Sequence, residues 1–93
     1  MGVLKMKLKY EFSAREMTGD YILIPLGEGA LAVSGIFSTN AIGAFICEQL
    51  KNDIAEEDLL KKILCSFEID EKSAKTDLME FLNEAQNEGI LLC

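Results

Sequence analysis

Residues 31–50 read LAVSGIFSTNAIGAFICEQL, and within them the hydrophobic pattern changes from that of a strand to that of a helix. Leu31 to Phe37 is a predicted strand, and Gly35 within it indicates a bulge or a close approach of another backbone. Asn40 is a predicted helix N-cap, because its side chain can accept from the exposed amides of a first turn. The apolar residues behind it repeat at helical spacing, namely Ile42, Phe45, Ile46 and Leu50.

The residues before this stretch predict further strands. Residues 4–10 alternate apolar side chains with lysines, so we expect a strand or an extended arm within residues 1–10. Phe12–Met17 and Tyr21–Leu26 are two predicted strands, joined by the turn signal Thr18-Gly19-Asp20. Pro25 cannot donate a ladder hydrogen bond and is expected near a strand end or on an edge. The connections are too short for crossovers, which predicts an antiparallel meander ending in Leu31–Phe37.

The residues after the stretch predict two more helices. The second helix carries an apolar stripe of Leu59, Leu60, Ile63, Leu64 and Phe67. The third is capped by Asp70 and ended by Gly89, and its stripe is Ala74, Leu78, Phe81, Leu82 and Ala85. We expect residues 90–92, which are apolar, to fold back onto the domain. Because sheet and helices are each one-sided, the sequence predicts a single α+β domain over residues 1–93, with three helices on one face of a small sheet.

The composition excludes several classes of function. The chain has 93 residues, no histidine, and a net charge of −7. Residues 1–37 carry four basic and four acidic groups, whereas residues 38–93 carry five basic and twelve acidic groups, which accounts for the −7. This balance argues against nucleic-acid binding, which requires a basic face. No apolar run spans a bilayer and no signal peptide is recognised, so a cytoplasmic protein is expected.

No catalytic or metal-binding set is found. The absence of histidine excludes imidazole bases and histidine metal ligands, and neighbouring acids such as Glu80 and Glu84 are expected to be solvated surface. Cys47 and Cys65 are expected to be buried small hydrophobes, and Cys93 a terminal exposed thiol. Three widely spaced cysteines fit reduced thiols better than a disulfide framework, and the CxxC spacing usual in zinc sites is absent, although three cysteines could hold a metal in geometry. No enzyme activity, metal or cofactor is therefore predicted.

Two features indicate a peptide-binding surface. Leu31–Phe37 has one neighbour in the meander, and an unpaired strand edge is a template for another chain. Met79 lies off the core direction of the third helix, on a flank with Lys75, Leu82 and Gln86. Methionine beside a sheet edge suits an adaptable peptide groove, although Met79 could equally contact the N-terminal arm or the C-terminal tail.

The ordered set of segments from Leu8 to Leu92 resembles the PqqD-like domains, also called RiPP recognition elements. The segments that carry the resemblance are Ile24-Pro25-Leu26-Gly27, Ser34-Gly35-Ile36, Asn40, Gly43-Ala44-Phe45-Ile46, Glu48-Gln49-Leu50, Glu56-Glu57-Asp58-Leu59, Phe67-Glu68-Ile69-Asp70-Glu71, Asp77-Leu78, Glu80-Phe81-Leu82 and Gly89-Ile90-Leu91. The chain departs from the family where Ala41-Ile42 replaces Glu-Thr, where Cys47 replaces tryptophan, and where Ala55 replaces a capping threonine. Asn52 or Asp53 is expected to take over that cap.

The resemblance implies a winged-helix-like fold that binds the leader of a ribosomally made precursor peptide. The leader would add to the third strand, lie against the third helix, and be presented to a modifying enzyme, often a radical S-adenosylmethionine enzyme. The site residues so implied are Leu31, Ala32, Val33, Ser34, Gly35, Ile36, Phe37, Lys75, Leu78, Met79, Leu82 and Gln86. Lys75 would pair with an acidic residue of the leader.

Three rival functions remain. A winged-helix transcriptional regulator is disfavoured, because residues 71–88 hold five acidic and two basic groups. A thiol-dependent protein would use Cys93 or a metal, and a thiol no more reactive than a free peptide cysteine would exclude it. A protein–protein adaptor would use the same surface as a leader-binding domain. The chain is expected to be a monomer or, through its open strand edge, a strand-swapped dimer.

Overall fold

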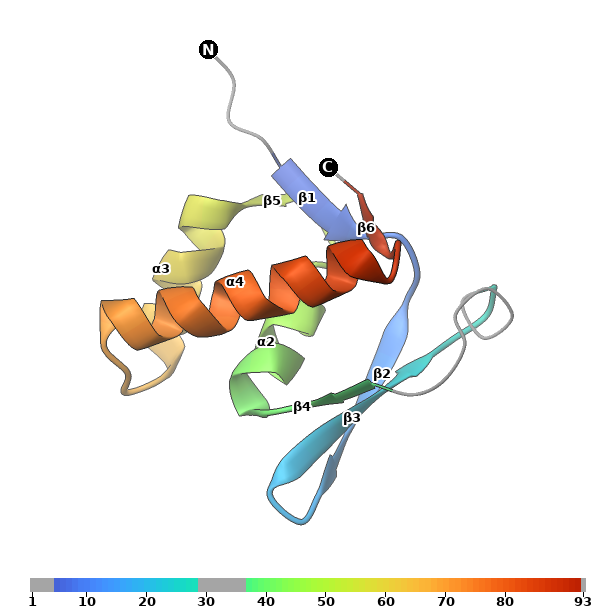
Figure 1. Cartoon of the computed structure of the whole chain (residues 1–93), viewed down its shortest axis with the longest axis horizontal. Helices are drawn as coiled ribbons and strands as arrows, with labels where there is room; N and C mark the ends of the chain where they lie inside the picture. Colours follow the sequence, from blue (N-terminus) through green and yellow to red (C-terminus); the bar gives the residue numbers. More distant parts are fainter. Residues whose placement is uncertain (1–4, 29–36, 93) are drawn as a thin grey trace.

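Three strands from the first half of the chain form one antiparallel sheet. The computed structural model describes residues 5–28 and 37–92. In it, β2 (Phe12–Met17), β3 (Asp20–Pro25) and β4 (Phe37–Thr39) pair in the order β2-β3-β4 (Figure 1). The predicted α+β fold with an antiparallel meander is confirmed. Residues 31–36 of the predicted third strand lie outside the described residues, and β4 itself begins at Phe37 and ends at Thr39.

The β2–β3 hairpin is closed by a two-residue turn. Thr18 and Gly19 both have positive φ, of 46° and 90°, and Met17 pairs with Asp20 across the turn. Positive φ at both central positions is typical of a type I′ turn, whose twist matches that of the flanking strands. Pro25 ends β3, as expected for a residue without an N–H.

The structure contains a second small sheet, so the prediction of one sheet covered by the helices is wrong in this respect. β1 (Lys5–Leu8) lies between β5 (Ile54–Ala55) and β6 (Leu91–Leu92) and is antiparallel to both. The N-terminal segment is therefore a strand rather than an arm, and Met6 and Leu8 alternate into the core. The C-terminal tail folds back as expected, because Ile90 is buried and Leu91 pairs with Leu8.

Two of the three helices in the described residues begin at side-chain caps. In α2 (Ala41–Gln49) the Asn40 Oδ1 accepts from the Gly43 N–H at 2.8 Å. In α4 (Glu71–Asn87) the two carboxylate oxygens of Asp70 accept from the N–H and Oγ of Ser73. Both predicted caps are confirmed.

The remaining described helix, α3 (Glu56–Ser66), begins without a side-chain cap. Its N-cap residue is Ala55, so the expectation that Asn52 or Asp53 takes over the cap is wrong. Ala55 is held instead by its pairing with β1, and it is buried. Three acidic residues in the first turn, Glu56, Glu57 and Asp58, offset the positive end of the helix dipole.

The end of α4 is fixed by a Schellman motif. The Gly89 N–H donates to the Gln86 carbonyl and the Ile90 N–H donates to the Ala85 carbonyl, each at 3.0 Å. Gly89 has φ of 74°, a conformation that glycine adopts without steric cost. The motif confirms the predicted helix end and turns the chain towards β6.

The core lies where α4 packs across α2 and α3 (Figure 1). Its fully buried large side chains come from α2, α3 and α4 or from their ends: Ile46, Leu50, Leu59, Ile63 and Leu78. Phe12 and Leu23 extend this core onto the inner face of the β2-β3-β4 sheet. The core therefore joins the sheet to the helices and fixes the space between β4 and α4.

The junction between β4 and α2 requires glycine at position 43. Only Asn40 separates the end of β4 at Thr39 from the start of α2. A Cβ on Gly43 would overlap the hydroxyl of Thr39 and lie 2.8 Å from the Thr39 Cβ. A side-chain rotation of Thr39 cannot move its own Cβ, so any residue larger than glycine must displace backbone.

We predict that Gly43→Ala destabilises the domain, although alanine is the better helix former by about 1 kcal/mol. Overpacking of this kind typically costs about 1–3 kcal/mol. The expected result is a fall in Tm of several degrees, measured by thermal denaturation with circular dichroism.

Asn83→Ala, at an exposed position within α4, is the control and should raise Tm slightly. A Tm for Gly43→Ala equal to or above that of the unmodified chain would show that the junction is not tightly packed.

Candidate functional site

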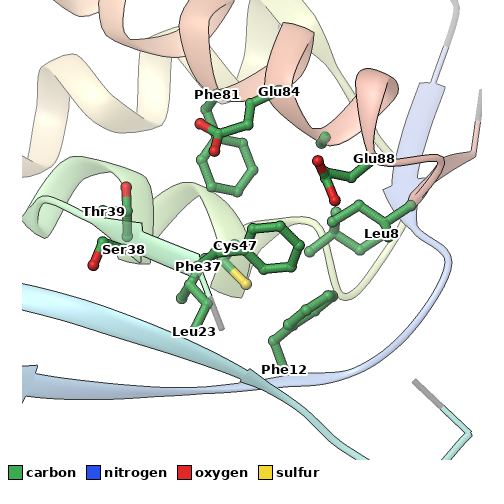
Figure 2. Close-up of a pocket in the computed structure, with 12 residues that line it drawn as sticks. Leu8, Phe12, Leu23, Phe37, Ser38, Thr39, Cys47, Phe81, Glu84 and Glu88 are labelled. Atoms are coloured by element: carbon green, nitrogen blue, oxygen red, sulfur yellow. The ribbon is translucent and has the colours of Figure 1, made fainter. Parts of the chain in front are cut away.

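A narrow apolar pocket lies between β4 and the C-terminal half of α4 (Figure 2). Its volume is about 30 Å³. The side chains that line it are Leu8, Phe12, Leu23, Phe37, Ser38, Thr39, Cys47, Phe81, Glu84, Ala85, Glu88 and Ile90. The floor is apolar, whereas the two sides carry the polar groups: Ser38 and Thr39 on the strand, Glu84 and Glu88 on the helix.

The aromatic rings of the pocket come from the sheet and from the helix. Phe12 and Phe37 pack edge-to-face, with ring centroids 6.0 Å apart. Phe81 is half-buried and projects from α4 towards the strand side (Figure 2). Ala85 also lines the pocket, and its short side chain leaves the space between helix and sheet unfilled. The pocket is therefore a site where an apolar side chain of a partner could be buried.

The strand beside the pocket is an edge strand among the described residues. β4 pairs with β3 on one side, through Tyr21 with Thr39, Ile22 with Ser38, and Leu23 with Phe37. Pairing on one side leaves backbone donors and acceptors along the other. An edge strand next to an apolar pocket is the arrangement that binds an extended peptide by strand addition.

The strand residues predicted as the binding site fall mostly outside the described residues. Leu31, Ala32, Val33, Ser34, Gly35 and Ile36 belong to the segment that the structure leaves undescribed. Phe37 is described, belongs to β4 and lines the pocket. Ser38 and Thr39 line it as well and were not predicted, because the sequence pattern ended the strand at Phe37.

The helix residues predicted as the binding site lie elsewhere on α4. Leu78 and Leu82 are buried in the core. Lys75, Met79 and Gln86 are exposed and do not line the pocket.

The pocket residues of α4 stand on the opposite flank from Met79. At about 100° per residue, Phe81, Glu84 and Glu88 lie roughly 140–200° around the helix from it. The sequence offered one signal for this flank: Glu84 and Glu88 are like charges four residues apart in a last turn that has no basic residue.

The thiol of Cys47 lies in the floor of the pocket and is expected to be unreactive. Burial raises its pKa from 9.0 to about 11, with a smaller contribution from the negative charge of Glu48. The thiol is therefore protonated at neutral pH and behaves as an apolar group. Cys47 is buried as predicted, whereas the prediction that Cys65 is buried is wrong. Cys65 follows the half-buried Leu64 on α3 and points to solvent.

The described residues contain no group of three or more histidine, cysteine, aspartate or glutamate side chains that could hold a metal ion. None of the described helices is long and apolar enough to cross a membrane.

Two comparisons with known proteins give a match. The family model of PqqD, described as coenzyme PQQ synthesis protein D, matches residues 21–91. Among solved structures, "TbiB1 in Complex with the TbiA(beta) Leader Peptide" is similar, with a TM-score of 0.62 and 21% sequence identity. The alignment covers 91% of this chain and 93% of that one, and at this identity it shows a shared fold. A comparison with curated proteins found no match.

We predict that the two described cysteines differ strongly in reactivity. At pH 8 an alkylating reagent such as iodoacetamide should modify Cys65 at the rate of a peptide thiol, because it is exposed. Cys47 should react far more slowly, because its pKa is about 11 and its side chain is buried. Mass spectrometry of proteolytic fragments measures the two sites separately.

Urea is the control for this comparison, since unfolding exposes Cys47 and should make the two rates similar. Equal rates in the folded protein would contradict the position of Cys47 in the pocket floor.

Proposed function

The chain belongs to the PqqD family, and we propose that it binds the leader segment of a ribosomally made precursor peptide and presents it to a modifying enzyme. Members of this family are non-catalytic peptide-binding proteins, and the resemblance read from the sequence is confirmed at the level of family and fold. The observation that carries the proposal is the apolar pocket beside an edge strand, between β4 and α4. The similar structure of TbiB1 is a complex with a leader peptide, which supports the same class of ligand here.

The proposed mode of binding is addition of the leader to β4. Main-chain hydrogen bonds then supply part of the affinity, and the pocket supplies register and selectivity. In the β2–β3 hairpin the Leu26 N–H donates to the Glu11 carbonyl, which sets the alternation of the ladder. Because Ile22 pairs with Arg15 on one side and Ser38 lies opposite Ile22 on the other, the same alternation directs the N–H and C=O of Ser38 away from β3. We therefore expect Ser38 to be a backbone contact of the leader.

The helix side of the proposed site is the flank of Phe81. The expectation drawn from the resemblance used the flank of Lys75, Met79 and Gln86, which remains the alternative. Phe81 is favoured because it lines the pocket together with Phe37, whereas Met79 does not. An apolar side chain of the leader would contact the rings of both phenylalanines and the Cys47 thiol.

The partner enzyme is proposed from the resemblance alone. A radical S-adenosylmethionine enzyme is the type that the resemblance favours. In this proposal the domain performs no bond-making step and holds the leader so that the remainder of the precursor reaches the enzyme.

We predict that Ser38→Pro abolishes binding of the leader peptide of the precursor encoded beside the gene. Proline removes one outward backbone donor and is tolerated on edge strands, so the fold should persist. Isothermal titration calorimetry measures the loss, and circular dichroism checks the fold.

Ala14→Pro is the matched control. By the same alternation its N–H points outward on the opposite edge of the sheet, on β2. This variant should bind the leader normally. Equal loss in both variants would indicate damage to the sheet, and normal binding by Ser38→Pro would exclude strand addition at this position.

We further predict that the two flanks of α4 contribute unequally to leader binding. Phe81→Ala should weaken binding about tenfold or more, because truncation of a buried aromatic contact costs about 1–3 kcal/mol at an interface. Met79→Ala should change binding less than twofold. An NMR titration of the labelled protein provides the map, with shifts expected around Phe37–Thr39 and Phe81–Glu88.

Shifts confined to Lys75, Met79 and Gln86, with normal binding by Phe81→Ala, would instead identify the alternative flank as the binding surface.

A further inference from the structure

Two glutamates, Glu84 and Glu88, line the pocket and indicate that its ligand carries a positive charge. We propose that the β4–α4 pocket selects an extended peptide that carries a small aliphatic anchor and, two residues away, a lysine or arginine that pairs with Glu84 and Glu88. The proposal rests on the proposed function, since it names which leader segment the site would accept.

Glu84 and Glu88 are the charged residues that line the pocket, and both are exposed. Figure 2 shows their carboxylates along the α4 side of the apolar floor. Within residues 5–28 and 37–92 the ion pair found is Lys51 with Glu48, so neither glutamate is neutralised by a described cation. Residues 29–36 contain no lysine or arginine in sequence.

The position of the pair on α4 is unfavourable for the free domain. Like charges four residues apart repel, and carboxylates near a helix C-terminus face the negative end of the helix dipole. No basic residue occupies the last turn, where cations stabilise a helix. A cationic side chain of a ligand would therefore meet two carboxylates and the helix end together.

The size of the pocket limits the anchor. Its volume of about 30 Å³ is far below the roughly 150 Å³ of an apolar cavity that holds benzene. An aromatic side chain would have to displace Phe37 or Phe81, whereas a small aliphatic side chain replaces little more than solvent. The floor offers no charged partner, so the anchor is apolar.

The spacing between anchor and cation follows from strand geometry. Alternate residues of an extended peptide share a face and lie about 6.6 Å apart. Glu84 and Glu88 are separated by about 6 Å along the helix axis. A lysine or arginine two residues from the anchor therefore points to the same wall of the groove and remains within reach of both carboxylates.

The test uses the synthetic leader peptide of the neighbouring precursor, and copies in which each lysine or arginine is replaced by glutamine. Binding to the intact chain is measured by calorimetry at low salt and at 0.5 M NaCl. The double variant Glu84→Gln with Glu88→Gln should bind the unmodified leader about tenfold more weakly at low salt, and its affinity should depend less on salt.

The matched control is Glu57→Gln with Glu68→Gln, which changes the net charge equally at exposed positions outside the pocket. This variant should bind the leader within twofold of the unmodified chain. One of the glutamine-substituted peptides should bind the unmodified chain about as weakly as the unmodified leader binds the Glu84 and Glu88 double variant. The double variant should bind that substituted peptide and the unmodified leader equally well, because the ion pair is already absent.

The outcomes separate this proposal from the proposed function. Unchanged affinity and salt dependence in the Glu84 and Glu88 variant overturn the charge selection, and strand addition still stands if Ser38→Pro abolishes binding. A bound leader segment without lysine or arginine also overturns it. No binding of the leader to the unmodified chain overturns both, and self-association of the chain through β4 would then be examined by analytical ultracentrifugation.

Discussion

The contact between Thr39 and Gly43 determines how the sheet meets the helices. A single residue, Asn40, separates β4 from α2, and its side chain caps the helix by accepting from the Gly43 N–H. Because Gly43 has no Cβ, the last residue of β4 can pack directly on the first turn of α2. The angle between strand and helix is thereby fixed. Since α4 packs on α2, the separation of β4 from α4 is fixed as well.

A pocket persists between β4 and α4 because the residues that face it differ in size. The sheet contributes Phe12 and Phe37, whereas the helix contributes Phe81 and the much smaller Ala85. A larger residue at position 85 would fill the space and join the sheet to the helix. Apolar surface left unfilled at a strand edge is unfavourable in a small domain, where the margin of stability is a few kcal/mol. The arrangement is understandable if a ligand completes the core.

Local features of the fold could be predicted from the sequence, because each depends on a few neighbouring residues. Asn40 and Asp70 cap their helices, Gly89 ends α4, and the turn at Thr18 and Gly19 closes the first hairpin. The second sheet could not be predicted in this way. β5 and β6 have two residues each, and both pair with β1 across most of the chain. Segments so short have no periodicity, and their pairing is decided by the packing of the helices.

The sequence also does not determine which flank of α4 faces the pocket. A helical wheel identifies the direction of the core, through Ala74, Leu78 and Ala85, but the two flanks beside it are equivalent until the neighbouring strand is placed. The direction in which α4 crosses α2 makes this choice. That direction brings Phe81 and Glu84 to the pocket and leaves Met79 away from it.

The two ends of α4 are stabilised in different ways. At the N-terminus Asp70 makes two hydrogen bonds to Ser73, and Glu71 complements the helix dipole. At the C-terminus the backbone is held by the Schellman motif at Gly89, so the end of the helix does not depend on favourable side-chain charges there. Because the Schellman hydrogen bonds hold the helix end, Glu84 and Glu88 can occupy neighbouring turns although their charges repel one another. The stability that the first turn and the final turn supply offsets an electrostatic cost of some tenths of a kcal/mol. A bound cation would remove that cost, so the same repulsion that weakens the free helix strengthens the complex.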